Sequence, residues 1–376
     1  MDDRPPGPDG GSEPATADRA ADGWAPASFP VDPAETADGV LDIPGATLSG
    51  FAIGRLRTIE PPSRWTRGAV YDAAGMLVEA SQRIGGTARD VVVAADPARF
   101  GSTPAGWLRR VTGGRRFRGR RLNGTWLYAG TWMHQFGHFV TETVTTLWPD
   151  PIDVAGLVAH PFAHLETRYP WQTDLVELSG YGARPLVLAL EPVRVERLLV
   201  PTRPFVAAAY ATPMAVRAWE RIAEAATGAA GTPEPSGNVF LSRSRFHRRT
   251  GDASRLDTRR LENEEELDEL MRSRGWRVIY PEEMPIGDQV RAVRSARVIA
   301  GMSGSALHLA AFAPSGTRVL EIGDLRSGGR PVRNQRVIDA VRGHLTAFVP
   351  LRGDEPRLAL GELARLLDEL GTQSGP

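Results

Sequence analysis

From residue 238 to residue 322, strand-like and helix-like segments alternate so regularly that few folds remain open to this part of the chain. The apolar runs VFLSR, WRVIY, RVIAG and TRVLEIG have the length and composition of buried strands. The clearest helix follows Asn263, which we expect to cap it, because three glutamates fill its first turn and Gly275 stands just past its end. A second helix around Val290 and a third over SALHLAAFA separate the later strands. This alternation predicts a parallel, Rossmann-like sheet with right-handed crossovers.

A second set of apolar runs precedes this unit and predicts another parallel sheet. Several of them are continuous, as in strands that are buried on both faces. They lie at residues 91–95, 125–130, 156–160, 185–190 and 197–201. The segments 133–148 and 213–227 have the length and amphipathic pattern of helices, and residues 228–237 are rich enough in Gly and Pro to be a linker. The chain is therefore predicted to be an α/β protein with two sheets.

The length of 376 residues suits two domains better than one core. Residues 1–38 are rich in Pro, Gly and Asp and predict a disordered tail. We expect a first α/β domain over 39–230, a second, Rossmann-like domain over 231–350, and a C-terminal helix and tail over 351–376. The amphipathic helix predicted at 357–371 would cross over and pack back on the first domain.

The composition argues against several classes of protein. Basic and acidic residues number 45 each, so the chain has no overall charge with which to hold nucleic acid or an anionic membrane surface. Cysteine is absent, which excludes disulfides and thiol chemistry and is compatible with a reducing compartment. The sequence has no run of about 18 apolar residues, and its amino terminus is acidic and rich in Pro. These features predict a soluble, cytoplasmic protein with no transmembrane segment and no nucleic-acid partner.

The loop after RVIAG is the first candidate binding element. Gly301 and Gly304 allow close backbone approach, and Ser303 and Ser305 add hydroxyls before a helix start, where anions bind. The spacing matches neither the GxGxxG dinucleotide fingerprint nor the Walker phosphate loop. The loop could equally be a tight turn, and His308, one turn further on, could be a structural histidine.

Arginines crowd the segment after VFLSR. Guanidinium groups match phosphate oxygens in a bidentate manner, so their density at this edge of the sheet suits a diphosphate ligand. Most of these arginines are expected to be solvated or paired with Asp252, Asp257 and Glu262. Arg243 and Arg249 are the candidates for phosphate contacts.

The predicted helix over 133–148 carries a candidate base. His134, His138 and Glu142 recur every four residues and are therefore expected on one face. A histidine and a carboxylate one turn apart can tune each other's proton affinity, as general acid/base catalysis requires. The spacing is not the HExxH arrangement, so no metal site is predicted. The alternative is a packed helix with a polar edge.

Two stretches together resemble the family 61 glycosyltransferases. FGHFVTETVTTLWP is similar to a family segment through Gly137, His138 and Glu142. The later stretch is similar to an ordered series of family motifs: Ser242, Arg243, Arg259, Asn263, Glu264, Gly275, Trp276, Pro281, Glu282, Gln289, the loop from Ala296 to Leu307, Phe312 and Glu321. Two positions depart from the family pattern, since Ser303 stands where the loop usually carries His, and Thr146 where many relatives carry Arg.

The resemblance implies a GT-B-like fold of two facing Rossmann-like domains and an inverting transferase that needs neither a metal nor another cofactor. Its partners would be a nucleotide sugar and a glycan or small-molecule acceptor. Glu142 or His138 would take the acceptor proton, and Arg243 with the helix opening at Gly304 would neutralise the departing nucleoside diphosphate. The nucleotide-sugar-binding residues are then expected to be Arg243, Arg249, Asn263, Glu264, Ser303, Gly304, Ser305, His308 and Glu321.

Two other functions stay open. A catalytically inactive relative could serve as a binding partner in polysaccharide assembly, and the replacement at Ser303 motivates that reading. A nicotinamide oxidoreductase is disfavoured because no glycine fingerprint follows an early strand. Nothing in the sequence indicates the oligomeric state, the donor sugar or the acceptor.

Overall fold

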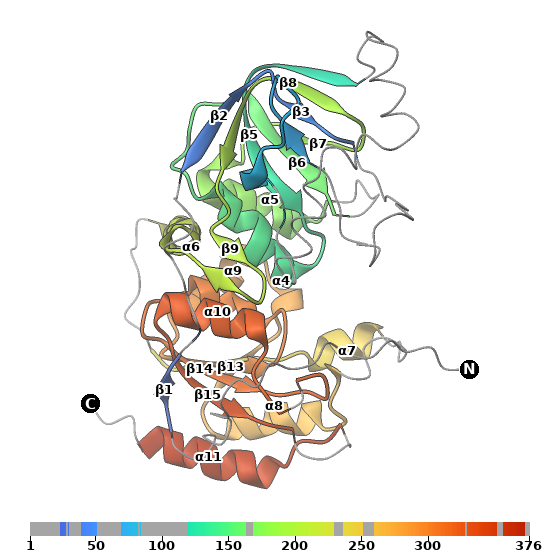
Figure 1. Cartoon of the computed structure of the whole chain (residues 1–376). Coiled ribbons are helices and arrows are strands. Elements are labelled where there is room, and N and C mark those ends of the chain that lie inside the picture. Colours follow the sequence, from blue (N-terminus) through green and yellow to red (C-terminus); the bar gives the residue numbers. More distant parts are fainter. Residues whose placement is uncertain are drawn as a thin grey trace, which may run out of the picture.

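The chain folds into two lobes, each built on a sheet with helices packed against it (Figure 1). The structure is a computed structural model that describes residues 23–27, 29, 39–50, 69–81, 83, 119–162, 168–228, 236–250, 259–327, 329–351 and 356–372. Within these ranges no helix is both long and apolar enough to cross a membrane. The predicted α/β class is confirmed.

The first lobe, at the top of Figure 1, has a mixed sheet whose central strands are parallel, as predicted. In sheet order its strands are β4 (Val70–Tyr71), β3 (Thr47–Leu48), β8 (Val193–Pro201), β5 (Arg120–Trp132), β6 (Gly156–Pro161) and β7 (Leu186–Leu188), with β2 (Val40–Pro44) also paired to β8. Strands β2 and β3 pair with β8 in antiparallel fashion. Our prediction missed this antiparallel edge, because its strands are short or carry polar residues. The run at 91–95 lies outside the described residues.

The segment 133–148 is largely helical, but it is not the regular α-helix that we predicted. The segment consists of α4 (Phe136–His138), a π-helical stretch η3 (Phe139–Thr143) and a 3₁₀ stretch η4 (Val144–Leu147). Threonine hydroxyls bond back to carbonyls of the preceding turn, with Thr145 Oγ1 2.6 Å from the Thr141 oxygen and Thr146 Oγ1 2.7 Å from the Thr143 oxygen. Such bonds compete with the regular helical ladder, and β-branched residues weaken it further. The segment is buried throughout from Phe139 to Leu147.

The second lobe has the predicted parallel sheet. Its strands, in sheet order, are β1 (Ala25–Pro26), β15 (Leu345–Val349), β14 (Arg318–Ile322), β13 (Val298–Met302), β11 (Asn238–Leu241) and β12 (Arg277–Ile279). Strands β11 to β15 are parallel to one another. Strand β15 and the preceding helix α10 (Arg333–Arg342), which we did not predict, continue the alternation. Strand β1 corrects the expected tail, because residues 25–26 pair with β15 in antiparallel fashion.

Helices α7 (Ser244–Thr250), α8 (Glu264–Ser273) and α9 (Ile286–Arg294) follow the strands of this lobe. The third predicted helix is instead the 3₁₀ helix η9 (Leu307–Phe312), which a turn precedes and Pro314 soon follows. Asn263 does not cap α8 with its side chain, contrary to our prediction. Its amide group bonds the backbone of Leu358, with Nδ2 2.9 Å from the carbonyl oxygen and Oδ1 3.0 Å from the nitrogen.

The C-terminal helix α11 (Leu360–Thr372) does not return to the first lobe, which corrects our prediction of a crossover helix. It lies at the bottom of Figure 1 beside α8. Leu363, Leu367 and Leu370 belong to the hydrophobic core of the second sheet. Arg274, just past α8, pairs with Asp368 at 2.9 Å. The two hydrogen bonds between the Asn263 side chain and the Leu358 backbone hold the segment before α11 at the start of α8. They favour packing of α11 on the second lobe.

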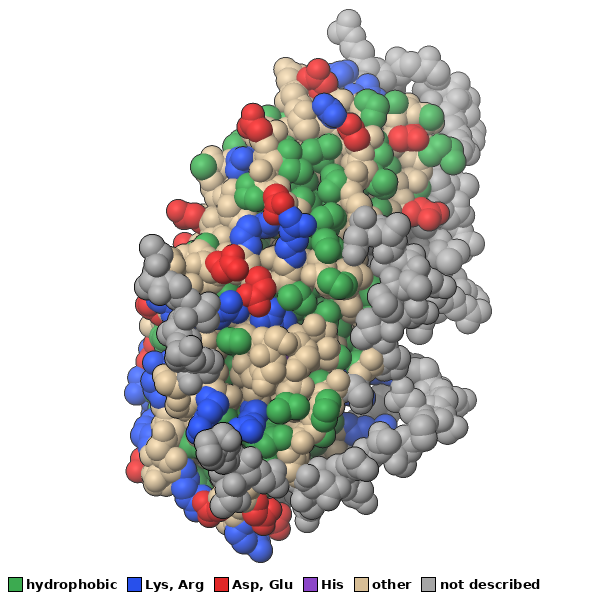
Figure 2. Space-filling model, turned by 90° about the vertical axis from the view of Figure 1, so that its left-hand side faces the viewer, with side chains coloured by type: hydrophobic (Ala, Val, Ile, Leu, Met, Phe, Trp, Pro, Cys, Tyr) green, Lys and Arg blue, Asp and Glu red, His purple; other side chains and the backbone are tan. Residues whose placement is uncertain are grey.

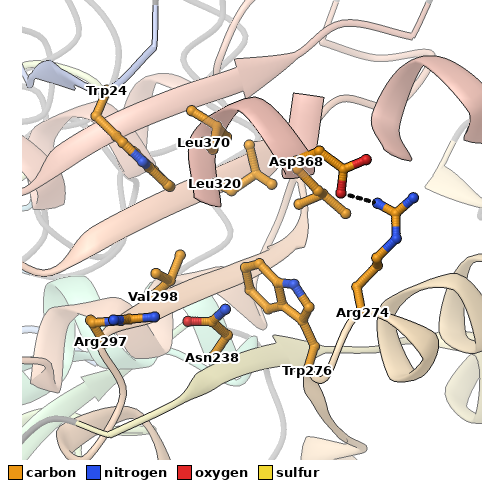
Figure 3. A pocket seen from close by; sticks show the side chains of 10 residues that line it. Trp24, Asn238, Arg274, Trp276, Arg297, Val298, Leu320, Asp368 and Leu370 are labelled. Atoms are coloured by element: carbon orange, nitrogen blue, oxygen red, sulfur yellow. Dashed lines mark ion pairs between the residues drawn. The ribbon is translucent and has the colours of Figure 1, made fainter. Parts of the chain in front are cut away.

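A cavity of about 410 Å³ lies under α11, at the amino ends of β11 and β13. Figure 3 shows Trp24, Trp276 and Leu370 on its walls, together with the pair of Arg274 and Asp368. It is therefore at the opposite end of the sheet from the loops that follow the strands.

Helix α6 (Pro213–Thr227), which was predicted at 213–227, joins the two lobes. It packs against η4 and η5 (Glu177–Tyr181) of the first lobe and against α9 and η9 of the second. Glu220 on α6 bonds Arg294 of α9 at 2.7 Å and Arg342, the last residue of α10, at 2.5 Å. The hydrophobic core around Trp219 is continuous from one lobe to the other. The division near residue 230 stays a prediction, because residues 229–235 lie outside the described ranges.

Charged side chains of both signs are interspersed over the face shown in Figure 2, with apolar side chains between them. This mixture agrees with the equal numbers of basic and acidic residues. A nucleic-acid-binding face would instead gather basic side chains into a stripe.

Candidate functional site

The candidate site begins where the second sheet changes direction. Strand β11 lies between β12 and β13, so the connections that leave β11 and β13 diverge. In open α/β sheets ligands bind outside the carboxyl ends of strands at such a point. Arg243 follows the end of β11, and Ser303 and Gly304 follow the end of β13. The sequence and the topology therefore point to the same edge.

Two guanidinium groups converge on the loop after β13. Arg243 Nη1 lies 3.4 Å from the Ser303 carbonyl oxygen, and Arg326 Nη2 lies 3.1 Å from the same oxygen. Burial lowers the pKa of Arg243; the positive charges of Arg326 and Arg259 lower it further, whereas Glu264 and Asp324 oppose the shift. A buried guanidinium with two like charges beside it is stabilised by an added anion.

Gly304 supplies the room between these guanidinium groups. It has a φ of +135°, and a Cβ atom built on it would lie 3.2 Å from Arg243 Nη1 and 3.5 Å from Arg326 Nη2. Its backbone therefore faces both cations. The helix opening that we expected at Gly304 is absent, since a turn separates this residue from η9.

Sequence reasoning missed Arg326, because the segment after β14 has no recognisable motif. Its Nε is 2.9 Å from Asp324 Oδ2, and Asp324 Oδ1 accepts the Arg326 backbone N–H at 2.9 Å. This turn aims Arg326 at the Ser303 carbonyl. Only its position after a parallel strand could have drawn attention to it.

Ser303 and Glu321 lie beneath the loop. The Ser303 hydroxyl donates to Glu321 Oε1 at 2.6 Å, and the Val332 backbone N–H donates to the same oxygen at 3.0 Å. Burial raises the pKa of Glu321 to about 7, although both hydrogen bonds favour the charged form. Both side chains are buried, so they support the loop, and only the Ser303 carbonyl contacts the guanidinium groups.

Three other residues of the second lobe were predicted to bind the nucleotide sugar. The side chains of Asn263 and Glu264 hold neighbouring segments in place, and Arg249 lies away from the loop after β13. Asn263 is engaged with Leu358, and Glu264 accepts bonds from His247 Nδ1 at 2.6 Å and from the Leu261 N–H at 3.2 Å. Glu264 nevertheless influences Arg243 through its charge. Arg249 is exposed on α7 and pairs with Glu283 at 2.5 Å. The structure therefore does not bring Arg249 to the loop.

The first lobe contributes His138 and Glu142. His138 Nδ1 is 2.6 Å from Glu142 Oε1, and Arg83 forms a bidentate pair with Glu142 through Nε at 2.6 Å and Nη2 at 2.9 Å. Burial alone would raise the pKa of Glu142, but the bonds from His138 and Arg83 and the charge of Arg83 lower it to about 2. A carboxylate with so low a pKa is a weak base, but its hydrogen bond to Nδ1 can hold the His138 ring in one orientation.

The His138 side chain is open to solvent on one side. It is 35% exposed, whereas that of Glu142 is 2% exposed. Since Nδ1 is engaged with Glu142, Nε2 is the nitrogen that remains to take a proton. His134 does not share its face, contrary to our prediction, because it precedes α4 and its ring packs against Phe162 with centroids 5.2 Å apart.

The two halves of the site meet at Gly137. A Cβ atom built there would lie 2.8 Å from His308 Cδ2 and 2.9 Å from Ser305 Oγ. Only a glycine allows this contact between α4 and the turn before η9. The predicted residues of both lobes are thus brought together, with Ser305 and His308 beside Gly137 and His138.

His308 packs against Gly137, next to His138 in the chain. Burial lowers its pKa to about 4, the Gln335 hydrogen bond opposes the shift, and the charges of His138 and Arg326 add to it. Its Nδ1 is 3.0 Å from Gln335 Oε1, while Gln335 Nε2 donates to Asp339 at 2.9 Å. Gln335 Oε1 therefore accepts a hydrogen bond from Nδ1–H of His308, which leaves Nε2 of the neutral imidazole as a possible acceptor.

Across the ranges that the structure describes, His, Asp and Glu side chains do not assemble in threes as metal ligands. Glu142, the carboxylate bonded to His138, is already engaged by Arg83.

The fold and the site define an α/β protein with two converging arginines at a sheet switch point and a histidine–carboxylate pair in the other lobe. Comparison with protein families identifies the class more closely: the family model for Glycosyltransferase 61 matches residues 136–320. The match spans the segment from α4 to β14 and confirms the resemblance to family 61, a family of glycosyltransferases. No curated protein matches the chain. Arg83, Arg326 and Gln335 lie outside the matched residues.

Proposed function

We propose that this chain is an inverting, metal-independent glycosyltransferase that moves a sugar from a nucleotide sugar to an acceptor hydroxyl. The two lobes would be the domains of a GT-B-like fold, divided near residue 230. The product would belong to a bacterial polysaccharide or glycoconjugate, made in the cytoplasm without a cofactor. The family match supports the class of reaction, and the geometry of the site supports the division of roles.

One observation carries the proposal: Gly137, the neighbour of His138, packs against Ser305 and His308, just past the loop on which Arg243 and Arg326 converge. A sugar bound where these two segments meet would have His138 beside it and the guanidinium groups near its phosphate. This is the charge distribution that glycosyl transfer requires, because positive charge develops on the sugar and negative charge on the leaving group.

The proposed reaction is a single displacement at the anomeric carbon. The acceptor oxygen forms a bond to this carbon on the face opposite the leaving group, while its proton passes to His138 Nε2. The bond between the anomeric carbon and the phosphate oxygen breaks, and the nucleoside diphosphate leaves with the bonding electrons. Arg243 and Arg326 offset its added charge, and Glu142 stabilises the imidazolium that forms on His138.

A second candidate is a relative that binds the nucleotide but does not turn over. The observation in its favour is that the Ser303 hydroxyl is committed to Glu321, so this side chain offers no donor to a diphosphate. Binding would then depend on the guanidinium groups and the backbone of the loop.

A thermal-shift screen of the purified full chain against UDP-, GDP-, CMP- and dTDP-sugars, NAD and ATP tests the proposal, since a ligand raises the melting temperature by mass action. We expect a shift with one class of sugar nucleotide and slow release of its sugar to water that EDTA does not affect. A shift without turnover would favour the second candidate. A shift with NAD or ATP alone would contradict both.

A further inference from the structure

Three buried polar side chains form a hydrogen-bonded network behind His308. His308 Nδ1 lies 3.0 Å from Gln335 Oε1, and Gln335 Nε2 lies 2.9 Å from Asp339 Oδ1. His344 Nδ1 lies 2.8 Å from the same carboxyl oxygen. Gln335 and His344 are fully buried, and Asp339 is 3% exposed. We call Gln335, Asp339 and His344 the α10 network, because the first two lie on α10 and the third lies just past its end.

The hydrogen bonds of Asp339 fix the direction of the network. Its Oδ1 atom receives bonds from Gln335 Nε2 and His344 Nδ1. Burial raises the pKa of Asp339, and these bonds and the charge of His344 oppose the shift. Oδ1 remains an acceptor in both protonation states, because a proton on the carboxyl group would lie on the other oxygen. Gln335 therefore directs its NH₂ group at Asp339 and its carbonyl oxygen at His308.

This direction determines which nitrogen of His308 carries the proton. An amide oxygen can only accept, so the proton of the neutral imidazole lies on Nδ1 and Nε2 keeps a lone pair. Burial lowers the pKa of His308 to about 4, so the ring is neutral at ordinary pH. A glutamine that was free to turn would offer its NH₂ group to Nδ1 equally well and would favour the other tautomer.

The Nε2 edge of His308 faces the junction of the two lobes. A Cβ atom built on Gly137 would lie 2.8 Å from His308 Cδ2, the ring carbon bonded to Nε2. No described residue bonds Nε2, yet this atom is not one of the described polar atoms that are both buried and unpaired. Nε2 of His308 is therefore open to solvent. A ligand at this junction can bond it directly.

A lone pair on nitrogen selects the part of a ligand that binds here. It accepts a hydrogen bond from a hydroxyl group, whereas it repels the oxygens of a diphosphate, which are acceptors themselves. Phosphate oxygens instead suit Arg243 and Arg326, which converge on the Ser303 carbonyl just before this turn. The group at His308 should therefore be a neutral one that carries hydroxyls, as the sugar of a sugar nucleotide does.

We infer that His308 Nε2 accepts a hydrogen bond from a hydroxyl group of the donor sugar, and that the α10 network consists of positioning residues that hold His308 in the tautomer which this bond requires. The inference rests on the proposed function, because it concerns the donor of that reaction. The network itself lies wholly outside the residues that the family model matches.

The first measurement is nuclear magnetic resonance of the ring nitrogens in the full chain, labelled with ¹⁵N-histidine. The chain has seven histidines, and the signal of His308 is the one that is lost in His308→Gln. We expect the proton on Nδ1 in the unaltered chain and a mixture of tautomers in Gln335→Met, which removes the amide and keeps the pair of Asp339 and His344.

Gln172→Met is the matched control. Gln172 is as fully buried as Gln335, and its amide bonds the Tyr169 nitrogen and the Met133 carbonyl oxygen of the first lobe. This variant loses a buried amide of the same size without touching the α10 network. The signal of His308 should therefore stay as it is in the unaltered chain.

The second measurement compares sugar nucleotides with nucleoside diphosphates by calorimetric titration. UDP-glucose, UDP-N-acetylglucosamine, GDP-mannose and dTDP-glucose are each paired with their nucleoside diphosphate. For the pair that binds the unaltered chain, Gln335→Met should raise the dissociation constant of the sugar nucleotide roughly three- to tenfold, the effect of one weakened hydrogen bond. The constant of the nucleoside diphosphate should stay unchanged, because it has no sugar to bond His308. Gln172→Met should change neither.

The possible outcomes separate this inference from the proposed function. A proton on Nε2 of His308 in the unaltered chain would overturn the inference and leave the proposed function standing, even if Gln335→Met did not fold. Equal weakening of both ligands in Gln335→Met would show a merely structural role, and no weakening of either would show that His308 does not bond the sugar. Absence of binding of every ligand by the unaltered chain would contradict the proposed function, and this inference with it, whatever the tautomer.

Discussion

The two sides of the site are built on opposite principles. On the donor side Arg243 and Arg326 face one carbonyl oxygen and repel each other, and although Asp324 pairs with Arg326, an added anion would reduce this repulsion. On the acceptor side every oxygen of Glu142 is engaged by Arg83 or His138, and the pair is complete in itself. The first arrangement favours binding of an anion, and the second favours a fixed orientation of a base. A substitution should therefore affect affinity on one side and rate on the other.

The largest expected effect is that of His138→Gln on the rate. A general base contributes roughly 100- to 10,000-fold to a reaction, so kcat should fall about 1,000-fold with little change in donor affinity. Release of the nucleoside diphosphate and thermal shifts with the donor measure the two quantities. Glu142→Gln should reduce kcat less, because it weakens the orientation of His138 without removing the base. If His138→Gln lowered donor affinity as much as it lowered kcat, the distinction between a side that sets the rate and a side that sets the affinity would be wrong.

Arg243→Gln should act on affinity instead. Loss of a charged hydrogen-bond donor costs about 1.5 to 3 kcal/mol, so the dissociation constant for the nucleoside diphosphate should rise about 10- to 100-fold. Calorimetric titration measures it. Arg249→Gln is the matched control, since Arg249 is exposed and paired with Glu283 and should leave the affinity unchanged. A similar loss in both variants would show that the effect is one of general charge and not of the converging guanidinium groups.

The smallest expected effect is that of Glu321, the buried carboxyl group beneath the loop after β13, on stability. The pKa of Glu321 is raised from 4.5 to about 7, so between these values the unfolded chain releases the proton that the folded chain retains. The free energy of unfolding should therefore fall as the pH rises, by about 1 kcal/mol between pH 5 and pH 6 for this group. Urea denaturation of the unaltered chain and of Glu321→Gln measures the difference. A variant with the same pH dependence as the unaltered chain would show that Glu321 is already charged at pH 5.

The strands and helices of the second lobe were largely predictable. Strands β11 to β14 and helices α8 and α9 carry apolar runs or amphipathic stripes, and these local patterns reflect burial on one or both faces. Strand β15 and helix α10 were missed, although their pattern is similar. The irregular helix over 136–147 could not be predicted from hydrophobic periodicity. Its threonine hydroxyls bond backbone carbonyls and compete with the regular helical hydrogen bonds.

The motifs of the candidate site could be predicted from the sequence, but the contacts between its side chains could not. His138, Glu142, Arg243 and Gly304 were recognisable because they stand in conspicuous positions beside strands and helices. The roles within the acceptor pair were not, because the pKa of Glu142 depends on Arg83, which is 59 residues away in the chain. Arg249 looked equivalent to Arg243 in the sequence, and only packing separated them.

Local sequence patterns thus determined the α/β class, the alternation of strands and helices along the second lobe, and the residue types near the loop after β13. The tertiary structure decided which of those residues share a space: it placed Arg326 beside Arg243, Gly137 against His308, and α11 under the second sheet. The physical reason is that periodicity records the burial of each segment by itself. Contacts between distant segments, and the protonation of buried groups, depend on partners that no single segment contains.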